Sequence, residues 1–178
     1  RCLRLGRIHL RQAQAAVASV TWQRLWLELG RTLADSAWQE GQAALALPIE
    51  PFAAGVLQLR AGALNKRGRR LEDLDAAGRH RLRIAAKKLR YATEFFSDLF
   101  AKRRVRPYVR SLAGAQDVLG GLNDAATLLR LLPEVAAAHT LDARVSGMIQ
   151  GWSAATTHLQ LDALALAWDH WQRQKPFW

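Results

Sequence analysis

Basic side chains recur along one face of a helix predicted to run from Asp75, as its N-cap, to about Phe100. This basic face consists of His80, Arg83, Lys87 and Arg90. Spacings of three and four residues place these four side chains within roughly 80° of one another on a helix. Like charges so arranged repel each other by about 0.2–0.5 kcal/mol per pair, and a bound polyanion would relieve this repulsion. The pattern therefore predicts a polyanion-binding surface.

The positive charge of the chain is concentrated around this helix. Residues 60–110 contain sixteen Lys and Arg against five Asp and Glu, whereas the rest of the chain contains ten of each. The whole formal net charge of +11 therefore lies in this segment. Such concentration indicates an anionic partner rather than a general need for solubility. We expect Arg60 and Arg67 in the preceding helix, and Arg110 after Pro107, to extend the surface.

Two residues beside the basic face admit more than one role. His80 is a candidate for anion contact or for a structural hydrogen bond, and these two roles stay equally open. A metal or general-base role is disfavoured, because the other histidines are scattered along the chain. Tyr91 is positioned either to donate its hydroxyl to a phosphate or to pack half-buried.

The segment 116–124 combines amide, carboxylate and glycine residues that resemble a catalytic motif at first sight. We interpret Gly120 and Gly121 as a helix break, followed by a cap at Asn123 or Asp124. Asp117 or Asp124 is a candidate for orienting a neighbouring Arg. No nucleophile motif, phosphate-binding glycine loop or paired carboxylate set accompanies them. We therefore expect no catalytic residue, no metal site and no cofactor.

Composition favours a single all-helical domain over residues 1–178. Ala and Leu dominate, β-branched residues are sparse, and the length allows a sizeable core. The single cysteine, Cys2, excludes a disulfide framework and suits a reducing compartment. The sequence has no membrane-length apolar run and no signal-peptide pattern, so we expect a cytoplasmic protein. Because the chain begins at Arg1, we expect it to be a fragment of a longer protein.

The apolar pattern predicts an antiparallel helical bundle with short connections. We expect helices over about 10–42, 52–70, up to 100, 107–120, 123–138 and 141–172, with a turn between Val20 and Trp22, a linker over 71–78 and a loop over 102–106. In the first helix, the expected buried residues are Val17, Val20, Leu25, Leu29, Leu33, Trp22, Trp26 and Trp38. In the last helix, they are Met148, Trp152, Leu159, Leu166 and Trp168.

Two segments together resemble the signatures of CHAD domains, the conserved histidine α-helical domains. Residues 80–95, HRLRIAAKKLRYATEF, are similar to the signature helix, and residues 112–124 are similar to the second signature. The resemblance implies two pseudo-symmetric helical repeats around a basic cavity or pore, with inorganic polyphosphate as the partner. It also implies that His80, Arg83, Lys87 and Arg90 face phosphate, and less directly that Arg60 and Arg67 do.

The signature helix occurs once, so the chain resembles the C-terminal half of such a domain. We therefore expect either an upstream half of the same domain or a homodimer that replaces it. The predicted function is non-catalytic polyphosphate binding, with association to polyphosphate granules. The alternatives are a nucleic-acid-binding module and an accessory domain of a triphosphate or polyphosphate hydrolase.

Overall fold

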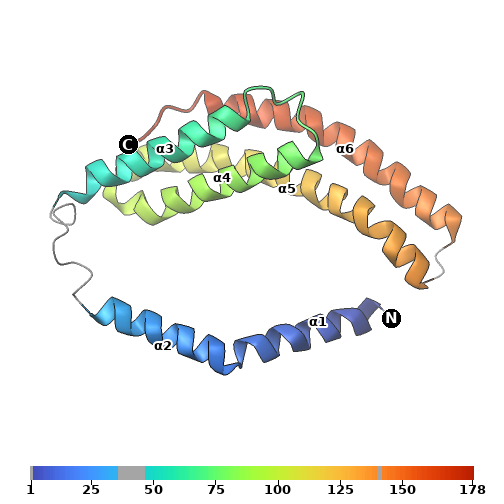
Figure 1. Ribbon diagram of the computed structural model, residues 1–178. Coiled ribbons are helices and arrows are strands. Elements are labelled where there is room, and N and C mark those ends of the chain that lie inside the picture. Colours follow the sequence, from blue (N-terminus) through green and yellow to red (C-terminus); the bar gives the residue numbers. More distant parts are fainter. Residues whose placement is uncertain (1, 36–46, 140–141) are drawn as a thin grey trace. The chain divides into compact units, whose positions relative to one another are not determined.

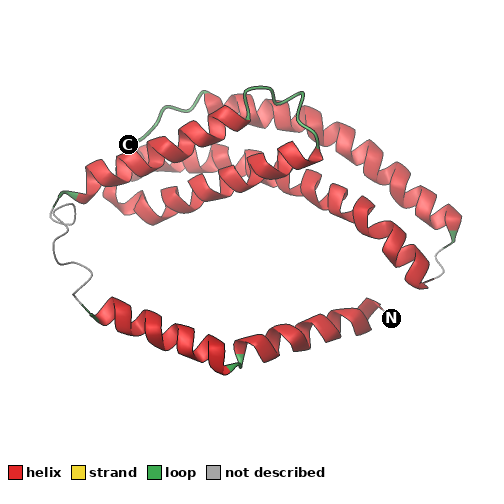
Figure 2. Cartoon of the chain, in the orientation of Figure 1, coloured by secondary structure: helices red, strands yellow, loops and turns green. Residues whose placement is uncertain are grey.

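The computed structural model describes residues 2–35, 47–139 and 142–178. Every regular element in these residues is helical, which confirms the predicted all-α fold (Figures 1 and 2). The chain divides into two compact units, Arg1–Leu47 and Pro48–Trp178. No helix in the described part is both long and apolar enough to cross a membrane. The expectation of a single domain stays a prediction.

The described residues of the first unit form two helices, α1 (Cys2–Val17) and α2 (Val20–Ala34). They meet at Ser19, whose side chain caps α2 by accepting a hydrogen bond from the backbone N–H of Trp22 at 3.2 Å. The predicted turn within the helical stretch over 10–42 is therefore present but lies slightly earlier in the chain than expected, and residues 36–42 of that stretch lie outside the described residues.

The predicted buried stripe of this unit is wrong. Seven of its side chains are exposed: Val17, Val20, Trp22, Leu25, Trp26, Leu29 and Leu33. Trp38, the eighth, lies outside the described residues. A pair of helices has no second layer to cover such a stripe, so within this unit the pattern does not produce burial.

The second unit is a bundle of α3 (Ile49–Arg67), α4 (Ala76–Phe96), α5 (Lys102–His139) and α6 (Ala143–Gln172). A short 3-10 turn, η3 (Ser97–Leu99), connects α4 to α5. Helix α4 packs between α3 and α5, and α6 packs along α5 (Figure 1). The fully buried leucines of the core are Leu57, Leu64, Leu82, Leu89, Leu112, Leu119 and Leu164.

Helix α4 forms as the sequence predicts. The Asp75 carboxylate accepts a hydrogen bond from the backbone N–H of Gly78 at 2.6 Å, which confirms the predicted N-cap. Its buried residues include Leu82, Ala85, Ala86, Leu89 and Phe96, whereas Ala92 is half-buried and Leu99 of η3 is 37% exposed. The burial of this apolar face directs the basic residues of α4 toward the two sides of the helix.

Helix α5 is continuous where the sequence predicted a loop, a break and a second cap. It begins at Lys102, contains Pro107 near its start, and passes through both glycines. A Cβ atom on Gly121 would lie 2.4 Å from Nε2 of Gln160, so this glycine leaves room for the end of the Gln160 side chain from α6.

Helix α6 buries a different face from the one predicted. Ser153, Leu164, Trp168 and Trp171 are buried, of which only Trp168 belongs to the predicted set. The other four predicted residues are exposed by 73, 64, 69 and 74%: Met148, Trp152, Leu159 and Leu166. Their spacing places them together on the opposite side of the helix, so the sequence contained two apolar stripes and the prediction chose the wrong one.

The C-terminal tail folds back on the bundle through aromatic contacts. Phe177 is 1% exposed and packs edge-on against Phe100 and Tyr108, with ring centroids 5.2 and 5.4 Å apart. Trp178 donates its indole N–H to Gln58 of α3 at 3.0 Å. Burial raises the pKa of the Tyr108 hydroxyl, which therefore stays neutral in the core. The tail thus ties α3 to α5 at one end of the bundle.

Candidate functional site

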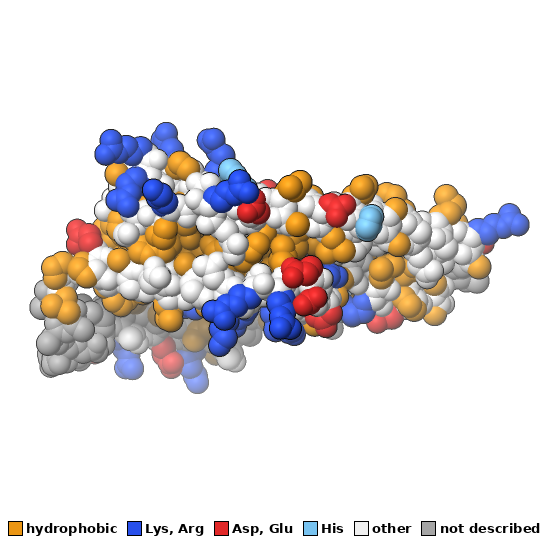
Figure 3. Space-filling view, turned by 90° about the horizontal axis from the view of Figure 1, so that it is seen from above, with side chains coloured by type: hydrophobic (Ala, Val, Ile, Leu, Met, Phe, Trp, Pro, Cys, Tyr) orange, Lys and Arg blue, Asp and Glu red, His pale blue; other side chains and the backbone are white. Residues whose placement is uncertain are grey.

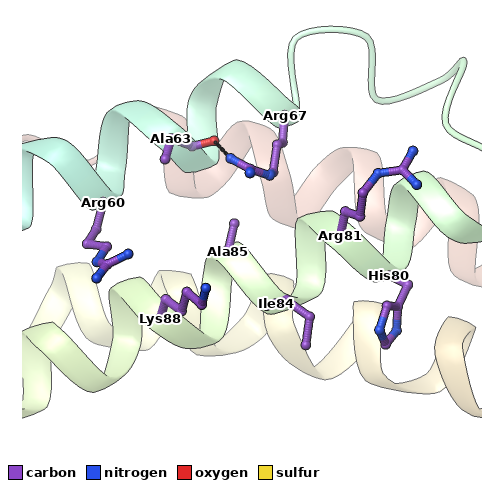
Figure 4. A pocket seen from close by; sticks show the side chains of 8 residues that line it. All are labelled: Arg60, Ala63, Arg67, His80, Arg81, Ile84, Ala85 and Lys88. Carbon is purple, nitrogen blue, oxygen red and sulfur yellow. Dashed lines mark hydrogen bonds between the residues drawn. The ribbon is translucent and has the colours of Figure 1, made fainter.

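Two grooves flank α4, one on each side. The first, which we call the α3–α4 groove, measures about 220 Å³ (Figure 4) and is lined by Arg60, Ala63, Arg67, His80, Arg81, Ile84, Ala85 and Lys88. The second, the α4–α5 groove, measures about 340 Å³ and is lined by Arg83, Lys87, Arg90, Tyr91, Gln116, Asp117, Gly120, Gly121 and Asp124. Cationic side chains of the same helix, α4, therefore line both grooves.

The α3–α4 groove has a pair of cations on each wall. Arg60 and Arg67 are two turns apart on α3, and Arg81 and Lys88 are two turns apart on α4. Seven residues of helix span about 10 Å, so each pair marks out the same length along the groove. Figure 4 shows that Arg60 extends from α3 toward α4. Among the described residues, none of the lining side chains is a carboxylate.

Small side chains give this groove its depth. Ala63 of α3 and Ala85 of α4 line it between the cations, where larger residues would fill the space. Arg67 donates its Nη1 to the backbone carbonyl of Ala63 at 3.1 Å, a contact within its own helix (Figure 4). Its guanidinium carries further donors, because an arginine has five N–H groups. The groove thus presents cationic donors above an apolar floor.

The α4–α5 groove differs because carboxylates face its cations. Asp117 and Asp124 are two turns apart on α5 and line the groove opposite Arg83 and Lys87. Opposite charges across a solvated groove attract only weakly, but they lower its net positive potential. This groove is therefore partly neutralised by the protein itself.

Arg90 shows the same neutralisation at atomic detail. Its Nε donates to Glu94 Oε1 at 2.6 Å, one turn along α4, and its Nη1 donates to Gln116 Oε1 at 3.4 Å. The hydrogen bond to Glu94, followed by the charge of that carboxylate, raises the pKa of Arg90, and Asp117 adds a smaller contribution. The predicted orienting role for Asp117 or Asp124 is thus largely taken by Glu94 and Gln116.

His80 forms a direct contact between the two segments, 80–95 and 112–124, that resemble the family signatures. Its Nδ1 lies 2.7 Å from Oδ1 of Asn123 on α5. The structural hydrogen bond, one of the two roles left open for His80, is therefore present, and the anion contact stays a prediction. In the described part of the chain, no group of three or more His, Cys, Asp and Glu is arranged to hold a metal ion.

The structure divides the predicted site residues among three places. Arg60, Arg67 and His80 line the α3–α4 groove, and the α4–α5 groove receives Arg83, Lys87, Arg90 and Tyr91. Arg110 lines a separate hollow with Arg106 and Glu94. Tyr91 is 57% exposed, and both of its predicted roles, contact with a phosphate and partial packing, stay predictions.

Sequence reasoning missed two lining residues, Arg81 and Lys88. Both lie outside the predicted basic face, on the side of α4 that faces α3. Their spacing of seven residues matches that of Arg60 and Arg67, and this shared spacing was the available signal. The side-chain set can hold a string of anionic groups at intervals of about two helical turns.

In Figure 3, Lys and Arg side chains gather in groups and hydrophobic side chains are exposed beside them.

The sequence model of the CHAD domain family matches residues 4–133 of this chain. The crystal structure of the CHAD domain from the plant Ricinus communis matches it with a TM-score of 0.67 and 33% sequence identity over 93% of this chain. The chain spans 59% of the length of that castor-bean chain. A search of curated proteins found no match.

Proposed function

Because this chain belongs to the CHAD domain family, we propose that it binds inorganic polyphosphate through the basic residues of its second unit. CHAD domains are binding or accessory domains rather than catalytic ones. Polyphosphate is the partner associated with the family, and it carries about one negative charge per internal phosphate. Its binding here is proposed on the family and on the charge arrangement of the grooves.

The observation that carries the proposal is the α3–α4 groove. Its four cations, Arg60, Arg67, Arg81 and Lys88, stand on two facing walls, and no lining carboxylate in the described part competes for them. A flexible polyanion gains free energy there by releasing its counterions, as nucleic acids do with basic proteins. Arg adds bidentate contacts to phosphate oxygens.

The α4–α5 groove supplies the second set of contacts. Arg83, Lys87 and Arg90 offer further cationic donors, and the exposed Tyr91 offers a hydroxyl. A long chain that leaves one groove reaches the other around α4, with Arg110 beyond them. We assign these contacts a smaller share of the binding free energy, because Asp117 and Asp124 repel phosphate in the same groove.

Titration across chain lengths tests the proposal. We expect long-chain polyphosphate to bind far more tightly than orthophosphate or ATP, because the affinity is summed over contacts along both walls. The control is the same titration at high salt, where counterion release contributes less and the differences between ligands shrink. Equal affinity for ATP and for long chains would contradict an extended site.

Nucleic acid is the second candidate partner. Base stacking on aromatic side chains supports single-strand binding. Among the described residues that line the two grooves, Tyr91 of the α4–α5 groove is the one Phe, Tyr or Trp side chain, so there is little surface for stacking. We therefore expect polyphosphate to displace both single- and double-stranded nucleic acid in a competition titration. Displacement only in the reverse direction would favour the nucleic-acid function. An accessory role beside a triphosphate or polyphosphate hydrolase uses the same grooves and stays a prediction.

The expected homodimer, or an upstream half of the same domain, also stays a proposal, as does association with polyphosphate granules. The exposed apolar stripe of α6, formed by Met148, Trp152, Leu159 and Leu166, is the surface that such an assembly would cover. We expect sedimentation to show association that strengthens with polyphosphate, by linkage. A well-folded monomer with and without polyphosphate would contradict the dimer.

A further inference from the structure

His80 occupies a position where its two ring nitrogens have different surroundings. Nδ1 lies 2.7 Å from Asn123 Oδ1, whereas Nε2 has no hydrogen-bond partner among the described residues. His80 is exposed and lines the α3–α4 groove, and Asn123 is half-buried on α5. Nε2 is therefore the ring nitrogen left to meet a ligand.

The hydrogen bond to Asn123 determines which nitrogen carries the proton in the neutral ring. An amide oxygen only accepts hydrogen bonds, so Nδ1 must be the donor in this contact. A neutral imidazole has one N–H, and that N–H is used by Asn123. Nε2 then presents a lone pair.

A lone pair at Nε2 cannot bind a phosphate oxygen, because both atoms are acceptors. The contact becomes favourable when Nε2 takes up a proton and donates to the phosphate oxygen as part of an imidazolium. We propose that polyphosphate binding is coupled to the uptake of a proton at His80 Nε2, with Asn123 as the positioning residue that imposes this coupling. This inference rests on the proposed function, because it concerns the same groove.

The charged groups around the ring agree with this coupling. Arg67 of α3 and Arg81 of α4 line the groove with His80, Arg83 lies one turn further along α4, and Asp124 follows Asn123 on α5. A bound phosphate chain brings negative charge beside these cations and so favours a protonated ring. The proton taken up comes from the solvent, and no bond in polyphosphate is broken.

Calorimetric titration in two buffers of different ionisation enthalpy measures the coupling directly. For the full chain near neutral pH with long-chain polyphosphate, we expect the heats to differ between buffers in the sense of net proton uptake, up to one proton per bound His80. We also expect the affinity to fall by up to about tenfold per pH unit as the pH rises through about 5 to 8, where histidines titrate. Long chains are used because their few end groups add little titration of their own.

Two variants separate the positioning role from a merely structural one. Asn123→Ala keeps every cation and His80, but lets the neutral ring place its proton on Nε2, so the uptake should fall below that of the wild type. His80→Gln should abolish the uptake while the cations still bind polyphosphate. His158→Gln is the matched control, because His158 is an exposed histidine on α6, and it should leave the uptake unchanged.

A measurement on the free wild-type protein keeps the inference testable if a variant fails to fold. Long-range proton–nitrogen NMR should show the neutral His80 ring protonated at Nδ1. An Nε2–H ring would overturn the inference. Tight polyphosphate binding without proton uptake would overturn it while leaving the proposed function intact, whereas the absence of polyphosphate binding would overturn both.

Discussion

The two grooves beside α4 have cations from the same helix but different electrostatic settings. In the α3–α4 groove, Arg81 and Lys88 face Arg60 and Arg67, so like charges stand on both walls. In the α4–α5 groove, by contrast, two aspartates of α5 share the lining with the cations of α4. The neighbouring helix, rather than α4 itself, therefore decides how much positive potential each groove offers to an anion.

This difference shows that the number of cations in a groove does not by itself determine how strongly the groove attracts an anion. Arg90 contributes a full positive charge to the composition, yet its donors already meet Glu94 and Gln116. Arg60 and Lys88 have no such carboxylate among the residues that line their groove in the described part. An unneutralised cation in a groove raises the local concentration of an anionic ligand, whereas a paired one contributes less.

The largest expected effect comes from removing a core side chain of α4, the helix that both grooves share. Leu89 is fully buried on the apolar face of α4, so Leu89→Ala should lower the free energy of unfolding by about 2–5 kcal/mol. Urea denaturation measures this loss. A free energy within about 0.5 kcal/mol of the wild type, the range of ordinary surface substitutions, would contradict the packing of α4.

Removing cations from the α3–α4 groove should produce the next largest effect. Arg81→Ala and Lys88→Ala should each weaken polyphosphate binding by about tenfold at low salt, since a hydrogen bond to a charged group contributes about 1.5 kcal/mol or more. Each should also reduce the salt dependence by about one phosphate contact. The fold should persist, because both side chains are exposed.

The matched controls are the same substitutions in the other groove. Arg83→Ala, Lys87→Ala and Arg90→Ala should weaken binding by only about two- to fivefold, as expected for weak surface electrostatic contacts. Thermal melting should be unchanged or slightly improved in each of them. Early melting of these variants would show that the cations hold the structure together, and would contradict a binding role.

Removing a carboxylate should make the two grooves more alike. Asp117→Asn should strengthen polyphosphate binding by about twofold, because a repulsion of about 0.4 kcal/mol is lost at this solvated position. Asp162→Asn on α6 changes the net charge equally but lies outside both grooves, so it should have no such effect. Equal gains from both variants would attribute the effect to net charge alone.

The smallest effect is expected from Glu94→Gln. The ion pair between Glu94 and Arg90 is 46 and 40% exposed on its two sides, so its loss should change the free energy of unfolding by less than about 0.5 kcal/mol. Freed from Glu94, Arg90 should gain a slightly stronger contact to polyphosphate. A large drop in melting temperature would show that the pair has a structural role.

Local sequence signals were sufficient for α4 and misleading for α5. In α4, an aspartate cap and a continuous apolar stripe agree, and the structure confirms both. In α5, Gly120, Gly121 and Pro107 are local helix breakers, yet the helix continues through all three, and Gly121 lies beside Gln160 of α6. That contact joins residues distant in the sequence, and no local pattern contains it.

The sequence predicted the positive charge of the site but not the arrangement of the charged side chains in space. The excess of cations between residues 60 and 110 was evident from the sequence alone. Its division into two grooves depends on where α3 and α5 lie against α4, which is set by tertiary packing. Likewise, α6 carries apolar residues on two faces, and tertiary contacts decide which face is buried: Trp168 packs against Gly68 at the end of α3, and Leu164 belongs to the core shared with the other helices.

The most direct test of the difference between the grooves is an NMR titration of the arginine side chains with long-chain polyphosphate. The guanidinium resonances of Arg60, Arg67 and Arg81 report on the α3–α4 groove, and those of Arg83 and Arg90 report on the α4–α5 groove. We expect the first group to shift at the lowest polyphosphate concentrations, and the second group to follow. Earlier shifts at Arg83 and Arg90 would contradict the assignment of the stronger site to the α3–α4 groove.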